Sequence, residues 1–111
     1  MNALLKTAAV TIRDDAEASA TAERLATHFA TGAAERDANR HLPYGELEQF
    51  SQSGLGGISV PASHGGAGVS SVTLAKVIAR ISQADGSLGQ IPQNHFYALE
   101  VLRVNGSEAQ Q

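Results

Sequence analysis

The sequence predicts an all-α fold, an up-down domain of about four to five helices with one ordered glycine-rich loop. Apolar residues recur at helical spacing in separate segments, and capping residues, proline or glycine mark where those segments begin and end. Six of the eleven glycines fall between residues 54 and 68, in one loop between two helical segments. The length of 111 residues, 42% of them hydrophobic, suits one hydrophobic core and therefore one domain.

The first helix is expected over residues 14–34, which are rich in alanine. Its apolar face consists of residues at helical spacing, namely Ala18, Ala22, Leu25, Ala26, Phe29 and Ala33. Asp14, with Glu17 three positions later, has the pattern of an N-cap and its reciprocal partner. The helical domain is therefore expected over residues 15–111, with residues 1–14 as a loose N-terminal tail.

A second, short helix is expected to have Pro43 at its first position, where a missing N–H costs nothing, and Gly54 at its end. Leu47 and Phe50 would share its inner face. The glycine-rich loop that follows is expected to be ordered, because a flexible linker would be polar throughout. The loop has four apolar residues that can dock onto a helical core: Leu55, Ile58, Val60 and Val69. Residues 58–60 are expected to be its only extended piece.

The clearest helical pattern starts after Ser70 or Ser71, where apolar residues occupy positions i, i+3, i+4 and i+7: Leu74, Val77, Ile78 and Ile81. The next helix is expected to begin near residues 85–87 and to end at Gly106. One face of it would carry Leu88, Ile91, His95, Leu99 and Leu102. Pro92 denies one hydrogen bond to the preceding turn, so it should bend this helix or separate its first turn.

Composition excludes several classes of function. A formal net charge of -3 provides no basic surplus for nucleic acid, and the absence of cysteine excludes disulfides and thiolate chemistry and fits a cytoplasmic protein. No signal peptide is expected, and no stretch approaches the roughly 20 apolar residues of a membrane-spanning helix.

Ser107 and Gln110 have the pattern of a capping box one turn before the end of the sequence. A helix that begins here favours the front part of a longer protein over a polar frayed tail.

The usual short motifs of catalysis are absent. The loop at residues 54–59 has Ser59 where a dinucleotide fingerprint needs its third glycine, and no serine lies in a Gly-x-Ser-x-Gly pattern. The four histidines lack the spacing of metal ligands, so no metal site is expected. Glu46 and Glu100 are expected on solvated helix faces. His95 stands on an apolar face, where the simplest role is that of a core histidine hydrogen-bonded to a carbonyl.

Five segments together resemble the N-terminal helical domain of the acyl-CoA dehydrogenase family. They are ERD at 35–37, SGLGGISVP at 53–61, HGGAG at 64–68, ADGS at 84–87 and GSEAQ at 106–110. The run GQIPQNHF at 89–96 is similar, more narrowly, to the dibenzothiophene monooxygenase-like branch, whose members are flavoproteins linked to sulfur acquisition. Gly57 and Gly86 depart from the family pattern, which commonly has bulkier residues or proline there, so both loops are expected to be looser.

The resemblance implies the first domain of a flavoprotein oxidoreductase, followed by a β-domain and a helical bundle and assembled as a homotetramer. FAD or FMN would be bound mainly by the domains that follow, so this chain alone is expected to be inactive. The substrate would be an acyl-CoA that is dehydrogenated or an organosulfur compound that is oxygenated. The alternative is a stand-alone helical binding or dimerisation module without catalysis.

In such an enzyme this domain would supply one wall of the pocket for substrate and flavin. The resemblance makes Asn94, His95, Phe96 and Tyr97 the candidate pocket residues, with His95 the candidate catalytic residue. An imidazole can donate a hydrogen bond to an oxygen of the substrate or of the flavin through either ring nitrogen.

Overall fold

The computed structural model describes residues 10–111, which form six α-helices and two short 3-10 turns without a strand among them. The helices are α1 (Asp15–Ala30), α2 (Ala33–Asn39), α3 (Tyr44–Gln52), α4 (Ser71–Ala84), α5 (Gly86–Gln90) and α6 (Gln93–Asn105), and the 3-10 turns are η2 (Leu55–Gly57) and η3 (Ala62–His64). The all-α prediction is confirmed. The described residues include no helix long and apolar enough to span a membrane.

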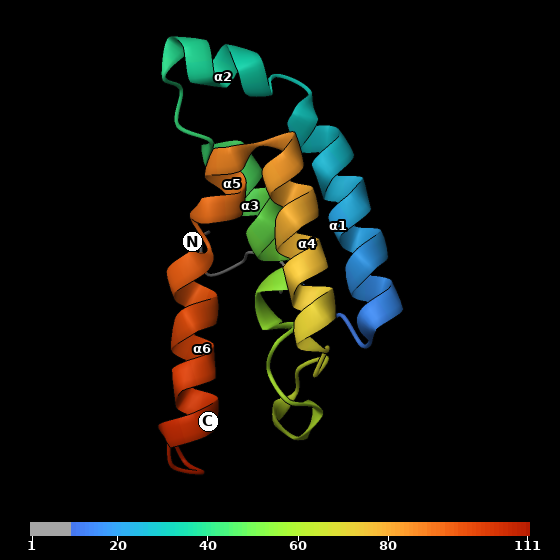
Figure 1. Ribbon diagram of the computed structural model, residues 1–111, viewed down its shortest axis with the longest axis vertical. Helices are drawn as coiled ribbons and strands as arrows, with labels where there is room; N and C mark the ends of the chain where they lie inside the picture. The colour runs from blue at the N-terminus through green and yellow to red at the C-terminus, as the bar shows by residue number, and fades with distance from the viewer. Residues whose placement is uncertain (1–9) are drawn as a thin grey trace, which may run out of the picture.

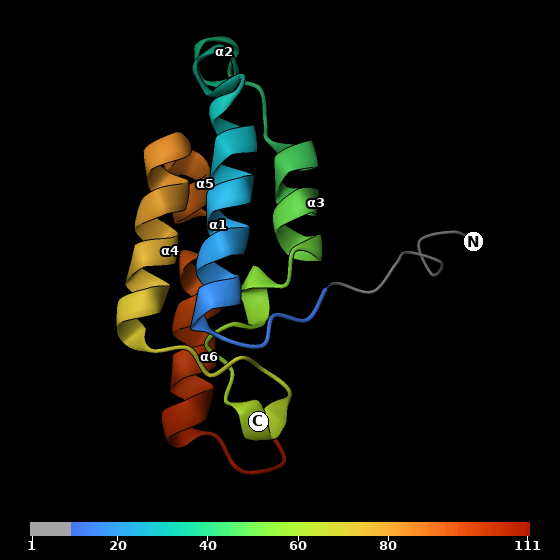
Figure 2. The ribbon, with the colours of Figure 1, turned by 90° about the vertical axis from the view of Figure 1, so that its right-hand side faces the viewer.

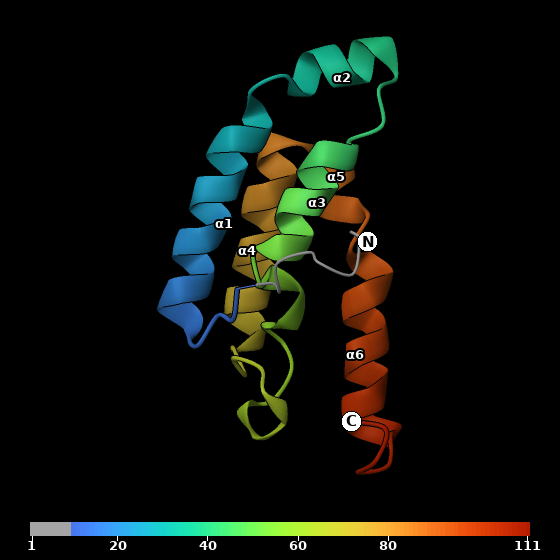
Figure 3. The same ribbon diagram turned by 180° about the vertical axis from the view of Figure 1, so that it is seen from behind.

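The long helices alternate in direction. In Figure 1, α1 and α4 run upward side by side, α3 and α6 run downward, and α2 lies across the top. Figure 2 shows the same alternation from the side, with the glycine-rich loop at the lower end of the bundle. Seen from behind, α3 lies between α1 and α6 (Figure 3). The most extensive helix packing joins α1 and α4, which the alanines of α1 allow to approach closely.

The core lies between α1, α3, α4 and the glycine-rich loop. The predicted inner face of α1 is buried from Ala18 to Phe29, and α4 contributes Val77 and Ile81. The largest fully buried side chains come from α1, the glycine-rich loop, α4 and α5: Phe29, Leu55, Ile58, Ile81 and Leu88. Leu47 and Phe50 pack against this core from α3, which begins at Tyr44, one residue after the predicted start at Pro43.

The predicted first helix ends earlier than expected. Gly32 adopts a φ of 86°, which breaks the helix after Ala30 and starts α2 in a new direction. Ala33 therefore begins α2 and is only half-buried, whereas the sequence pattern placed it on the apolar face of α1. Asp14 caps α1 as predicted, by accepting from the backbone N–H of Glu17 at 2.8 Å. The reciprocal bond is shifted by one residue, because Glu17 accepts from the N–H of Arg13.

The segment just before α1 is packed, in contrast to the prediction of a loose tail over residues 1–14. Ile12 is only 3% exposed and belongs to the core. The backbone N–H of Val10 donates to the carbonyl of Gln52 at 3.0 Å, which fixes the segment to the end of α3. Residues 1–9 of the predicted tail lie outside the described part of the chain.

The glycine-rich loop is ordered by docking, as its apolar residues predict. Leu55 and Ile58 are fully buried, and Val60 and Val69 are half-buried. The predicted extended piece at 58–60 is wrong: Ile58 has helical φ and ψ of -68° and -26° because it follows the 3-10 turn η2. Backbone hydrogen bonds from Gly68 to Val60 (2.8 Å) and from Val69 to Ile58 (3.0 Å) close the loop on itself.

The last part of the chain is divided at Pro92, as its position predicts. Asp85 caps α5, and Pro92 precedes α6. The predicted apolar face of this helix is wrong at three positions, because Ile91 (50%), His95 and Leu102 (36%) are exposed. Instead, α6 turns Phe96 (7% exposed) into the core. Beyond Gly106, the capping box of Ser107 and Gln110 is formed, with reciprocal bonds of 2.8 Å and 3.3 Å.

Candidate functional site

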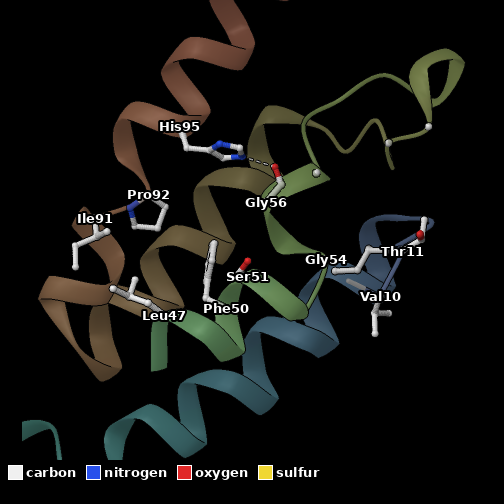
Figure 4. Close-up of a pocket in the computed structure, with 14 residues that line it drawn as sticks. Val10, Thr11, Leu47, Phe50, Ser51, Gly54, Gly56, Ile91, Pro92 and His95 are labelled. Carbon is white, nitrogen blue, oxygen red and sulfur yellow. Dashed lines mark hydrogen bonds between the residues drawn. The ribbon is translucent and has the colours of Figure 1, made fainter. Parts of the chain in front are cut away.

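The main candidate site is a cavity of about 600 Å³ between α3, the glycine-rich loop and the connection from α5 to α6. Figure 4 shows Leu47 and Phe50 of α3 on one side of it, with Ile91 and Pro92 from the connection. The glycine-rich loop supplies five glycines and no side chain. Among residues 10–111, none that lines the cavity is a lysine, arginine, aspartate or glutamate. The arrangement therefore suits an uncharged, largely apolar ligand.

His95 lies at the edge of this cavity and joins α6 to the loop. Its Nε2 lies 2.6 Å from the carbonyl oxygen of Gly56 (Figure 4). A carbonyl only accepts hydrogen bonds, so Nε2 must carry the hydrogen and donate it. In the neutral ring this leaves the lone pair on Nδ1 as an acceptor. The predicted hydrogen bond to a carbonyl is present, but the side chain is exposed and is not a core histidine.

The four predicted pocket residues do not come together. His95 lines the apolar cavity, whereas Asn94 lines a second cavity and Phe96 is buried in the core. Tyr97 is 70% exposed and lines neither cavity. Successive residues of an α-helix point about 100° apart, so four neighbours cannot share one wall. The functional roles of these residues stay predictions.

The second cavity, of about 900 Å³, lies between α2, the start of α3 and the connection from α4 to α5. It contains a largely buried charged group, Arg36, whose guanidinium donates to Asp85 at 2.8 Å and to the carbonyl of Phe29 at 2.7 Å. Glu46 lies 3.5 Å from the same guanidinium. These bonds connect three elements, namely the end of α1, helix α3 and the start of α5. The role of Arg36 is therefore structural.

Carboxylates with shifted pKa values lie away from the apolar cavity. The hydroxyl of Thr73 and then the backbone N–H of Ser70 lower the pKa of Asp15 below its ordinary value of 3.8. A hydrogen bond from Arg80 lowers the pKa of Glu23, and one from Arg103 lowers that of Glu100. Each of these groups stabilises helices rather than lining a site. The part of the chain that the structure describes contains no group of three or more potential metal ligands.

Sequence reasoning missed several residues that line the apolar cavity. The sequence pattern places Val10 and Thr11 in the loose tail, although the apolar residues at positions 10 and 12 just before the helix cap are a signal that this segment packs. The same pattern identifies Ile91 and Pro92 only as parts of a helix. Their place in the cavity depends on the turn between α5 and α6, which a linear pattern does not specify.

Comparison with known proteins identifies the family. Residues 13–111 match the model for the acyl-CoA dehydrogenase N-terminal domain. Dibenzothiophene monooxygenases of Rhodococcus erythropolis and Rhodococcus qingshengii are each 33% identical over 97 residues, which cover 87% of this chain and 23% of those proteins. The chain thus spans about a quarter of the length of these relatives. No solved structure matches it significantly. The chain belongs to the acyl-CoA dehydrogenase family, and residues 13–111 form its N-terminal domain.

Proposed function

We propose that this domain forms one wall of the substrate cavity in a flavin-dependent monooxygenase that oxygenates a small, uncharged organosulfur compound. The observation that carries the proposal is the apolar cavity of about 600 Å³, whose described lining residues include no acidic or basic side chain apart from His95. The similarity to dibenzothiophene monooxygenases supports the substrate class and the reaction.

Acyl-CoA dehydrogenation is the competing reaction within the family. An acyl chain also suits an apolar cavity, but the phosphates of coenzyme A favour lysine or arginine side chains, and the described lining residues include neither. The relatives quoted above are monooxygenases, which favours oxygenation.

The residues of the cavity do not fit the phosphate part of a flavin nucleotide. In the described part of the chain, its side-chain hydrogen-bonding groups are the hydroxyls of Thr11 and Ser51 and the ring of His95, with no guanidinium or ammonium group among them. We therefore propose that the residues that bind FAD or FMN lie mainly outside this domain. The part assigned to this chain is to hold the substrate and exclude water on one side.

His95 is the group in this wall that can hold a proton. Because Nε2 donates to the carbonyl of Gly56, Nδ1 accepts a hydrogen bond from a donor in the cavity when the ring is neutral. When the ring is protonated, Nδ1 donates instead. We propose that His95 thereby holds or accepts a proton at Nδ1 beside the reacting oxygen of the substrate.

The test uses the complete polypeptide that contains this domain, supplied with reduced flavin, oxygen and dibenzothiophene. Formation of an oxygenated sulfur product is expected, whereas oxidation of an acyl-CoA with an artificial electron acceptor is not. His95→Gln should lower turnover by about 10- to 100-fold, because an amide can replace the bond to Gly56 but cannot exchange the proton. His41→Gln is the matched control, since His41 lies outside this cavity. Unchanged turnover in His95→Gln would remove the proposed role of His95.

A homo-oligomer is proposed for the complete enzyme. The outer face of α6 leaves Tyr97, Val101 and Val104 exposed at i, i+4 and i+7, by 70%, 41% and 62%. The same stripe supports the alternative of a non-catalytic helical binding module. A complete polypeptide that binds flavin and forms product excludes that alternative, whereas one that binds no flavin and only self-associates supports it.

A further inference from the structure

We infer that residues 10–12 form a strap across the apolar cavity and that Val10 and Thr11 determine the size of ligand that it admits. These residues line the cavity on the side opposite Ile91 and His95 (Figure 4). The inference rests on the proposed function, because it concerns the ligand of the same cavity.

The strap is fixed on both sides of Thr11. On one side, the N–H of Val10 donates to the carbonyl of Gln52 at 3.0 Å, at the end of α3. On the other side, Ile12 is 3% exposed and packed in the core. The strap cannot move away from the cavity without breaking that hydrogen bond or exposing Ile12. A wall fixed in this way selects ligands by size, since it cannot withdraw to admit a larger one.

Gly54 allows the strap to lie as close to the cavity as it does. A Cβ atom at this position would lie 2.2 Å from the carbonyl oxygen of Val10 and 3.1 Å from Cγ1 of Ile12. Gly45, in α3, lines neither large cavity, and a Cβ atom there would have no neighbour within 4 Å. The two glycines therefore form a matched pair, in which only Gly54 is required for the position of the strap.

Val10 is suited to a test because its side chain can be enlarged without disturbing the core. It is 64% exposed and lines the cavity. Val72, on α4, is equally exposed at 64% and lines neither large cavity. Substitutions at Val72 therefore report the effect of a large exposed side chain that is remote from the strap.

The experiment measures dissociation constants of the 111-residue chain, labelled with ¹⁵N, for thiophene, benzothiophene and dibenzothiophene by NMR titration. Val10→Trp should weaken binding of dibenzothiophene by about tenfold and that of thiophene by less than about twofold, as expected for steric exclusion in an apolar pocket. Val72→Trp should leave the ratio of the two constants unchanged. Gly54→Ala, which displaces the strap, should change that ratio, and Gly45→Ala, outside both large cavities, should not.

The outcomes separate the strap from the proposed function. If the wild-type chain binds the probes and Val10→Trp keeps the wild-type ratio, the strap inference is overturned and the proposed function stands. If Gly54→Ala does not fold, Val10→Trp alone decides. If the wild-type chain binds none of the three probes at this cavity, the proposed function fails and the strap inference fails with it.

Discussion

Arg36 and Asp85 form a largely buried ion pair that closes the upper end of the bundle across 49 residues of sequence. Nη2 of Arg36 lies 2.8 Å from Oδ2 of Asp85, and the two side chains are 14% and 11% exposed. The other oxygen of Asp85 accepts from the backbone N–H of Ser87 at 3.0 Å and so starts α5. The pair therefore sets where α4 ends and where the connection toward the apolar cavity begins.

Arg36→Met should destabilise the domain by about 3 kcal/mol, because it leaves Asp85 as a partly buried charge without its partner. Urea denaturation followed by circular dichroism measures the change in the free energy of unfolding. Arg103→Met is the control, since Arg103 pairs with Glu100 at an exposed site and its replacement should change the free energy of unfolding much less. Equal losses in the two variants would contradict the role assigned to Arg36.

Stability should fall in acid because of two exposed carboxylates. Hydrogen bonds from Thr73 and Ser70 lower the pKa of Asp15 below 3.8, and Arg80 lowers that of Glu23 below 4.5. The folded state then binds fewer protons than the unfolded state between the unfolded and folded pKa values. The contribution of each group is complete above the unfolded pKa and is lost as the pH falls through the folded pKa.

We expect the free energy of unfolding to decrease as the pH falls below about 4.5. Asp15→Asn and Glu23→Gln should each reduce the steepness of that decrease, measured by denaturation at a series of pH values. A double variant with the same pH dependence as the wild type would show that these hydrogen bonds do not contribute.

Gly54→Ala should destabilise the domain by about 2 kcal/mol, because alanine at a φ of 90° is strained and its Cβ meets the carbonyl of Val10. Gly57→Ala should change stability by no more than about 0.5 kcal/mol, since open space surrounds that position. Thermal denaturation of both variants distinguishes a requirement for glycine at one position from a general cost of substitution in the loop.

Ile12→Ala should cost about 3 kcal/mol, the usual effect of removing a buried aliphatic side chain. Val72→Ala, at an exposed position, should change stability by no more than about 0.5 kcal/mol. A negligible effect at Ile12 would mean that the segment before α1 is the loose tail that the sequence suggests.

Elements with a strong local signal were predicted well. The spacing of Leu74, Val77 and Ile81 predicts α4, and the caps at Asp14, Ser70 and Asp85 are formed. In each case the residues that specify the element are within a few positions of one another. The break at Gly32 was missed because an alanine-rich pattern continues across it on both sides.

The candidate site was predicted only in part because it depends on contacts between distant segments. The family resemblance directed attention to residues 94–97, but of these His95 alone reaches the cavity. The hydrogen bond from His95 to Gly56 spans 39 residues, and Val10 and Thr11 approach the same cavity from before α1. Local spacing contains no information about which helix faces which loop.

The most direct test of the central claim is the map of amide shifts in the ¹⁵N-labelled chain during titration with benzothiophene. If the apolar cavity is a substrate wall, saturable shifts should occur at Leu47, Gly56, Ile91 and His95, and none at Val72. Shifts confined to the outer face of α6, or no saturable shift at these four residues, would contradict it.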